Sequence, residues 1–499
     1  MGGCGHNTII IFSTIMSRNL VYVDDELGGV EEDFNDVETC LQMLKRSRDR
    51  WNETVNDVEA ILIEDQMVGR NTERIFRTRK VYPRENYKQS CWYLFLQRDF
   101  SDLNSRDSKF FRNRFTVPYQ LYQQLLQLAK EWFPQKKYDI AGREWTPIFL
   151  KLLGTLRILG KGCSWDLLYE LSGISGEVHR KWTLQFLHKF GEEMYPIHVH
   201  GPRDTDELNK VTSLYAAVGF PGCVGSTDCV HIRWEMCPSL WFSSYKNGKN
   251  SYASIAYEMT VDHTKRFQST TVGHYGTTSD MTIVKFDGFV NKVKYDPLFT
   301  ETEFKYLQAD NKWALEKGLY LLVDGGYHKW RIMQCPFKFS LDDQATRWSE
   351  QAESVRKDVE CSFGILKKRF QFLKNSITWH RKSDIDNAVF SCVILHNMLH
   401  EFDGYDIRWE DELNNCHNDE EEQICLDRIR RRVVRTLENN TDHSNCGYLH
   451  YNMNNINYAN YLNDEVEMEI TNEHTLLQKK LIKHFDVKWL NNEIRWITI

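Results

Sequence analysis

Near its middle the chain reads VGSTDCVHI over Val224–Ile232, an apolar and β-prone run that contains one carboxylate, Asp228. A second such run, LLVDGGY over Leu321–Tyr327, ends at Asp324 just before two glycines. A carboxylate inside a strand-like apolar run is costly to bury without a partner. We therefore predict two strands of one sheet that bring Asp228 and Asp324 to a common edge. The neighbouring glycines would let a ligand approach Asp324 closely.

A third acid, Glu360, lies within a helical pattern expected over Trp348–Leu373. One apolar stripe runs along this expected helix: Val355, Val359, Phe363, Leu366 and Phe370. Carboxylates from two strands and a helix can hold Mg²⁺ or Mn²⁺, which prefer hard oxygen ligands. Two such cations about 4 Å apart can hold the attacking and leaving oxygens of a phosphodiester. The pattern predicts a metal-dependent nuclease in which Asp228, Asp324 and Glu360 are catalytic metal ligands, with Asp228 bridging.

The plain alternative is that these acids are ordinary surface charges. The chain contains 70 Asp and Glu residues, so any three of them carry little information alone. Their joint placement in apolar surroundings favours the metal site.

The residues around the acids predict an α/β fold from about Tyr215 to His400. The runs Tyr252–Val261 and Phe267–His274 are expected to form a hairpin, and Asp280–Val293 an amphipathic helix. Asp384–His400 is apolar enough to be a buried helix. We expect a mixed β-sheet flanked by helices.

The preceding region has helical spacing and contains a helix-turn-helix candidate. Ser164 can cap one short helix, Gly173 can turn the chain, and Ser175 can cap a longer second helix. The second helix would offer Arg180 and Lys181 to a DNA duplex. Any helical bundle contains such corners, so a purely structural role stays open.

Composition divides the chain into five segments. They are an acidic then basic, partly disordered arm (1–90), a helical domain (91–210), the α/β domain (211–400), an acidic and Asn-rich, partly disordered insert (401–470) and a C-terminal helix (471–499).

The net charge of −7 is unusual for a nucleic-acid binder. Arg428–Arg435 contains an arginine cluster that could serve in nuclear import or lie on an exposed helix. The 13 cysteines include no C-x-x-C pair, which favours a reducing compartment. The apolar stretch Thr8–Met16 is shorter than the roughly 20 residues of a membrane span, so no membrane is expected.

In these motifs the chain resembles the PIF/Harbinger superfamily of transposases and derived nucleases, part of the broader DDE group. The family has an Asp in a G-x-x-D-x-x-H strand followed by Ile or Val, an Asp in D-x-G-Y and a Glu in E-x-x-F-G-x-L-K-x-R-F. The matching stretches are Gly225–Ile232, Asp324–Tyr327 and Glu360–Phe370, and the family's Leu-His-Asn signature matches Leu395–Asn397. The resemblance covers about Phe110 to His400, and its last motif is the most specific.

The resemblance implies an RNase H-like mixed sheet behind an N-terminal helical region with a helix-turn-helix. It adds Asp280 to the metal ligands and Mg²⁺ or Mn²⁺ as cofactor. It further implies cleavage at element ends, joining of the freed 3′-hydroxyls to target DNA, a Myb-like partner protein, nuclear localisation and a homo-oligomer. Three basic residues beyond Glu360 could clamp DNA or simply form a solvated face: Lys367, Lys368 and Arg369.

Two alternative functions remain open. One is a host-adopted DNA-binding or scaffold protein that kept the fold and lost cleavage. The other is an RNase H-like nuclease acting on RNA or hybrids. His396 and His400, at i, i+4 spacing, could bind zinc but are better explained as core or capping histidines.

Overall fold

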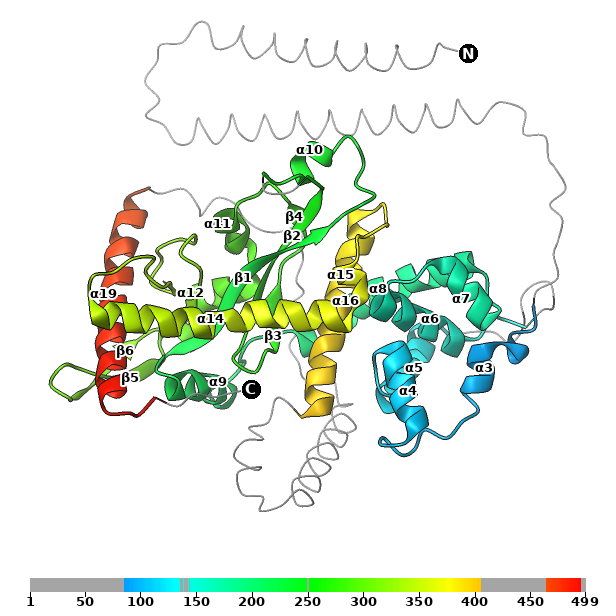
Figure 1. Cartoon of the computed structure of the whole chain (residues 1–499), viewed down its shortest axis with the longest axis horizontal. Coiled ribbons are helices and arrows are strands. Elements are labelled where there is room, and N and C mark those ends of the chain that lie inside the picture. The colour runs from blue at the N-terminus through cyan, green and yellow to red at the C-terminus, as the bar shows by residue number, and fades with distance from the viewer. Residues whose placement is uncertain are drawn as a thin grey trace, which may run out of the picture. The chain divides into compact units, whose positions relative to one another are not determined.

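The computed structural model describes residues 85–134, 138, 142, 144–248, 251–404 and 464–494, with side chains of the last helix described from residue 472. The chain divides into two units, Met1–Pro83 and Arg84–Ile499, and all described residues belong to the second (Figure 1). The arginine cluster at Arg428–Arg435 and most of the predicted arm and insert lie outside the described residues.

A mixed sheet forms the centre of the described part. Its strand order is β3-β2-β1-β7-β8, with β4 also paired to β2. The strands are β1 (Cys223–Arg233), β2 (Ser254–Val261), β3 (Phe267–Thr270), β4 (His274–Tyr275), β7 (Tyr320–Leu322) and β8 (Met333–Gln334). β1, β2 and β3 are antiparallel neighbours, whereas β7 runs parallel to β1 and β8 parallel to β7. The predicted α/β character and the predicted hairpin are confirmed.

Strand β2, next to the central strand β1, is buried along its whole length because both of its faces are covered. Its apolar residues account for this, and its one acid, Glu258, is also fully buried. The hairpin turn that follows is held by Asp262, whose Oδ1 accepts hydrogen bonds from the backbone N–H groups of Thr264 and Arg266. Burial on two faces makes the register of this strand strongly specified.

The single helix predicted over Asp280–Val293 is wrong. The segment forms α11 (Asp280–Ile283), a 3₁₀ turn η2 (Val284–Phe286) and α12 (Gly288–Tyr295). Asp287 causes the break, since its buried carboxylate accepts bonds from the N–H groups of Phe289 and Val290 and caps α12. The hydroxyl of Ser269 on β3 also donates to Asp287 and ties this cap to the sheet.

A long helix, α14 (Asp343–Arg369), follows β8 in the chain. It crosses the sheet and contacts β1, β2 and β7 (Figure 1). It starts five residues before the predicted Trp348, at a cap formed by Asp342, and ends at Arg369. A separate short helix, α15 (Gln371–Lys374), follows. Asp358 of α14 pairs with His263 and, at 2.9 Å, with Lys265, which fastens the helix to the hairpin turn.

Two further helices complete the surroundings of the sheet. α16 (Lys382–Asp403) is almost wholly buried and packs on α8 and β3. α19 (Asp464–Leu490) packs on α14, β8 and the two-stranded sheet of β5 (Glu303–Leu307) and β6 (Trp313–Lys317). Short helices α10 (Phe242–Tyr245) and α13 (Pro297–Thr300) lie in the loops.

Helices precede the sheet in the chain: α3 (Cys91–Phe95), α4 (Arg106–Phe115), α5 (Tyr119–Trp132), α6 (Ile148–Lys161), α7 (Trp165–Ser172), α8 (Gly176–His198) and α9 (Thr205–Ala217), after the 3₁₀ turn η1 (Tyr87–Gln89). The predicted corner lies between α7 and α8: the Ser164 hydroxyl caps α7, and Gly173 has a φ of 68°. Ser175 occupies the N-cap position of α8 but its side chain makes no capping bond. His179 of α8 is fully buried, where it packs against Gly154 of α6 and hydrogen-bonds with the Ser172 hydroxyl of α7. These contacts hold α7 and α8 in place on α6.

Two buried apolar clusters stabilise the described part. One joins the helices before the sheet to β2, β3 and α16, and the other joins β7, α12, β5 and α19. α14 contributes its first half to the second cluster and its second half to the first, with the change between Val355 and Val359. None of the described helices is both long and apolar enough to cross a membrane.

Candidate metal and nucleic-acid site

Asp228 lies in the middle of β1, opposite Met259 of β2, and its side chain is 20% exposed. Its Oδ1 accepts a bond from the backbone N–H of Cys229 at 2.8 Å, and its Oδ2 accepts one from Arg356 Nη1 at 3.3 Å. Burial raises the pKa of Asp228 to about 6. The Cys229 amide and the Arg356 guanidinium oppose this rise, whereas the negative charges of Glu360 and Asp280 add to it. A nearby positive charge therefore favours the ionised form of the Asp228 carboxylate.

Arg356 of α14 brings three carboxylates together. Its guanidinium donates to Asp228, to Glu353 at 2.8 Å and to Glu360 at 2.8 Å, and its own side chain is only 6% exposed. We call these four residues the Arg356 cluster. Glu353 and Glu360 remain 37% and 47% exposed, so the cluster opens to solvent on their side.

Asp324 follows the end of β7, the strand that runs parallel to β1, and is exposed. Its carbonyl accepts a bond from the N–H of Tyr327, which closes a turn, and the Tyr327 hydroxyl donates to buried Glu258 at 2.8 Å. The hydroxyl of Thr227, next to Asp228, donates to the same Glu258 oxygen at 2.9 Å. Burial raises the pKa of Glu258 well above its ordinary value. Glu258 thus couples the Asp324 turn to the strand that carries Asp228.

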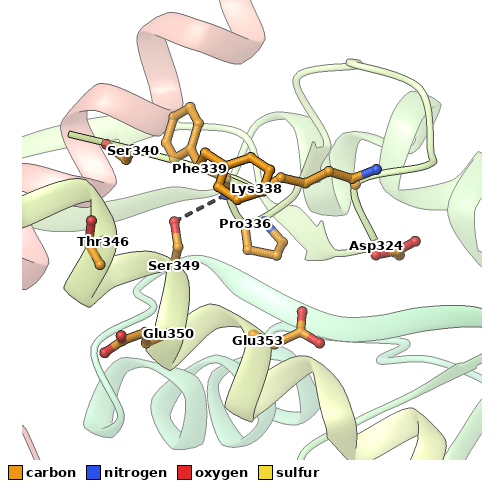
Figure 2. Close-up of a pocket in the computed structure, with 11 residues that line it drawn as sticks. Asp324, Pro336, Lys338, Phe339, Ser340, Thr346, Ser349, Glu350 and Glu353 are labelled. Atoms are coloured by element: carbon orange, nitrogen blue, oxygen red, sulfur yellow. Dashed lines mark hydrogen bonds between the residues drawn. The ribbon is translucent and has the colours of Figure 1, made fainter. Parts of the chain in front are cut away.

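Asp324 also lines a cavity of about 520 Å³ that opens between the loop after β8 and α14. Figure 2 shows Asp324 at the right and Glu353 below, with Lys338 and Phe339 in the upper part and Ser349 at the left. The hydroxyl of Ser349 accepts a bond from the N–H of Phe337, which holds the loop to the helix. The cavity therefore joins Asp324 to the exposed edge of the Arg356 cluster through Glu353.

Asp280, at the start of α11, lies beside Cys229 and outside the Arg356 cluster, but near enough for its charge to add to the pKa of Asp228. Its carboxylate, the Cys229 thiol and a His231 ring nitrogen lie within 4.8 Å of one another. Within the described ranges this is the one trio of possible metal ligands with such close atoms. Asp228, Asp324 and Glu360 are thus gathered at one edge without forming a closed trio, and Arg356 stands between two of them.

The residues fit a divalent cation. The donors of the Arg356 cluster are carboxylate oxygens, which suit Mg²⁺ or Mn²⁺. The cluster already holds a positive charge, that of the guanidinium, at the point where three carboxylates converge. A bound cation would be held by Asp228 and Glu360 in the place of that guanidinium, with Asp324 at the neighbouring strand end.

The predicted DNA-binding residues lie in two places. Arg180 and Lys181 are on α8, where both pair with Glu177, Arg180 through two bonds of 2.8 and 3.0 Å. The other three lie in the last turn of α14. There Lys368 is exposed, Lys367 donates to the carbonyl of His231, and Arg369 donates to His396 on α16. Lys181 and Lys368 are the most exposed of the five.

Sequence reasoning missed Arg356, Glu353 and Glu258. The first two carry a readable signal, since Glu353, Arg356 and Glu360 are spaced i, i+3 and i+7 and therefore share one helix face. That spacing is typical of solvated helix surfaces, so it pointed away from a buried arginine. Glu258 is one acid within a long apolar strand, the same signal that identified Asp228.

His396 and His400 are buried histidines of the core, as favoured from the sequence. Their Nε2 atoms bond to the carbonyls of Lys265 and Thr264 at 3.0 and 2.7 Å, so both hold the β2–β3 turn.

Comparison with known proteins gives one family. Residues 199–407 match the family of plant transposon proteins. The match supports a transposase-derived protein, and it spans all four acids together with α14 and α16. No curated protein and no solved structure matches the chain.

Proposed function

We propose that the chain is a metal-dependent DNA endonuclease or transposase of the DDE type, derived from a PIF/Harbinger-like element. The observation that carries the proposal is the Arg356 cluster: Asp228 from β1 and Glu360 from α14 converge on one positive charge, beside Asp324 at the end of the adjacent strand. The similarity to plant transposon proteins over residues 199–407 agrees with it.

In this proposal the cations, when bound, activate the attacking water or 3′-hydroxyl and stabilise the leaving oxygen. Asp228 holds them from the sheet and Glu360 from α14. Asp324, exposed at the mouth of the cavity, would hold them from the neighbouring strand end, and Tyr327 with Glu258 fixes the position of its turn. Cleavage at element ends followed by joining of the 3′-hydroxyls to target DNA is the reaction that this arrangement would serve.

The remaining parts of the proposal concern architecture and partners. The sheet, with three antiparallel strands followed by two parallel ones, supports an RNase H-like domain. The α7–α8 corner supports a helix-turn-helix that places Lys181 toward DNA. We further propose a nuclear location, a homo-oligomer and a Myb-like DNA-binding partner, since the net charge of −7 is poorly suited to end recognition by the chain alone.

Nicking of supercoiled plasmid by the purified chain in Mn²⁺ tests the proposal. Asp324→Asn should reduce the rate by at least about a hundredfold, because it removes a carboxylate that would hold the cations on which charge stabilisation in the transition state depends. Asp310→Asn, a change to an exposed carboxylate in the turn between β5 and β6, is the matched control and should cleave as wild type does. Equal nicking by wild type and Asp324→Asn would exclude this site.

A second function is favoured by the same guanidinium. Arg356 pairs with Asp228 and Glu360 within the protein, so these carboxylates have a positive partner that is part of the chain, as a transposase-derived DNA-binding or scaffold protein would require. Titration calorimetry with Mn²⁺ separates the two functions. Binding that is lost in Asp228→Asn supports the nuclease, and no binding to wild type supports the scaffold.

A further inference from the structure

We propose that Cys229, His231 and Asp280 form a binding site for Zn²⁺ or a similar borderline divalent cation, distinct from the carboxylate site of the Arg356 cluster. This inference does not rest on the proposed nuclease function. It rests on a thiol, an imidazole and a carboxylate whose ligand atoms already lie within 4.8 Å of one another.

The alternation of a β-strand creates the first half of the site. Successive side chains of β1 point to opposite faces of the sheet. Cys229 and His231 therefore share one face, and Asp228 lies on the other face, toward α14. Cys229 pairs with Glu258 of β2 and His231 with Ala256, which fixes the separation of the two ligands along a regular ladder.

A close approach of the backbone brings the third ligand. Gly276, just after β4, lies so near β2 that a Cβ there would be 2.3 Å from the carbonyl of Tyr245 and 2.5 Å from that of Ser254. The next residue, Thr277, is held by two bonds to the carbonyl of Ser244. Asp280 follows this anchored segment directly, so its position beside β1 is set by packing and not by a free loop.

The imidazole of His231 is held in place from behind. Its Nδ1 lies 3.1 Å from the hydroxyl of buried Ser254. Metal-binding histidines generally have such a partner on their second nitrogen, which fixes the tautomer and the ring orientation. With the proton of the ring on Nδ1, the lone pair is on Nε2, which is then the ligand atom.

The distances suit a small cation. Zinc bonds of about 2.3 Å to sulfur and 2.0–2.2 Å to nitrogen or oxygen place tetrahedral ligand atoms roughly 3.4–3.6 Å apart. Side-chain shifts below about 1 Å would close the trio from its present limit of 4.8 Å. Three protein ligands leave a fourth position for water or a phosphate oxygen, on the side where Asp280 is exposed.

The donor chemistry separates this site from the neighbouring one. A sulfur and a nitrogen donor favour Zn²⁺, Co²⁺ or Cu²⁺ over Mg²⁺, which prefers oxygen. Binding replaces the thiol proton by the cation, and the proton passes to solvent. Asp280, which the family resemblance counts with the metal ligands, would then be held on the face of β1 that carries Cys229.

Cobalt absorption tests the site in the full-length, metal-free protein. Co²⁺ should bind with one equivalent and produce a sulfur-to-cobalt charge-transfer band in the near ultraviolet, and Zn²⁺ should abolish the band by displacement. An excess of Mg²⁺ should leave it unchanged. Cys229→Ser should remove the band, whereas the matched control Cys361→Ser, which alters an exposed cysteine on α14, should retain it.

Two further variants secure the assignment. His231→Gln and Asp280→Asn should each weaken Co²⁺ binding at least about tenfold, and Asp280→Asn changes an exposed residue, so its folding is easily maintained. A wild-type protein without the charge-transfer band, or a band that survives in folded Cys229→Ser, overturns the inference. Neither result depends on DNA cleavage, so failure here and failure of the nuclease proposal are distinguishable.

Discussion

Replacing Arg356 by glutamine tests whether the carboxylates around it form a cation site. The guanidinium is 6% exposed and makes hydrogen bonds to Asp228, Glu353 and Glu360. Arg356→Gln leaves these three acids without their shared positive charge. We expect the variant to be less stable than wild type in EDTA and to gain more stability from Mn²⁺.

The magnitude follows from burial. Removing one partner of a buried ion pair costs about 3–5 kcal/mol. Glu353 and Glu360 are 37% and 47% exposed, and exposed pairs contribute only about 0–1 kcal/mol each. The loss in EDTA should therefore be about 3–5 kcal/mol, mostly through Asp228. In wild type a cation must first displace the guanidinium, so Mn²⁺ should bind the variant at least about tenfold more tightly, the equivalent of about 1.4 kcal/mol.

Urea denaturation in EDTA and in Mn²⁺ measures both quantities. Mn²⁺ at ten times its dissociation constant should stabilise Arg356→Gln by about 1.4 kcal/mol. Arg347→Gln is the matched control, because Arg347 lies on the same helix and pairs with Asp486 of α19, away from the cluster. It should lose stability without any change in its response to Mn²⁺. An Arg356→Gln protein that Mn²⁺ stabilises no more than it stabilises wild type would refute the reasoning.

Three further predictions concern the scaffold. Asp287→Ala should lower the unfolding free energy by about 2–4 kcal/mol in urea denaturation, because it removes a buried helix cap and leaves its donors unpaired; Asp287→Asn should lose less. Gly154→Ala should cost about 1–3 kcal/mol, since its Cβ would lie 2.3 Å from His179 Nδ1, and a double-mutant cycle with His179→Ala should show a combined cost below the sum. Burial lowers the pKa of Lys151 to about 8 from 10.5, so Lys151→Met should gain on the order of 3 kcal/mol at pH 7. Wild-type stability should rise between pH 8 and 10.5, where the unfolded chain keeps a proton that the folded chain has released, and an equal rise in the variant would contradict this assignment.

The sheet and the long helices could be predicted because their signals are local. Asp228 and Asp324 stand out as single charges in apolar, β-prone runs, and the structure has them on β1 and two residues after β7. The apolar stripe through Val359 and Phe363 likewise gives α14 within a few residues. Burial of one helix face leaves a periodic pattern, and burial of both strand faces leaves a continuous apolar run; neither signal needs knowledge of the partner.

The errors arise where a tertiary contact overrides the local pattern. The stretch Asp280–Val293 has helical periodicity throughout, yet Asp287 interrupts it because its carboxylate is satisfied by the next helix and by Ser269 of β3. Arg356 was missed because its i−3 and i+4 acids resemble a solvated surface, whereas Asp228 of β1 draws the guanidinium inward. In neither case does the sequence near the residue contain the strand that decides the outcome.

Strand β1 presents its ligands to two faces of the sheet, and this division explains the arrangement of the acids. Asp228 faces α14 and meets Glu360 through Arg356, whereas Cys229 faces away from α14 and meets Asp280. Asp280 nevertheless raises the pKa of Asp228, so the two faces communicate electrostatically at this edge. A positive charge on either face therefore stabilises Asp228 in its ionised form: the guanidinium or a hard cation on one side, a borderline cation on the other. Because Asp280 lies with Cys229, a cation bound on that face would offset the negative charge by which Asp280 raises the pKa of Asp228.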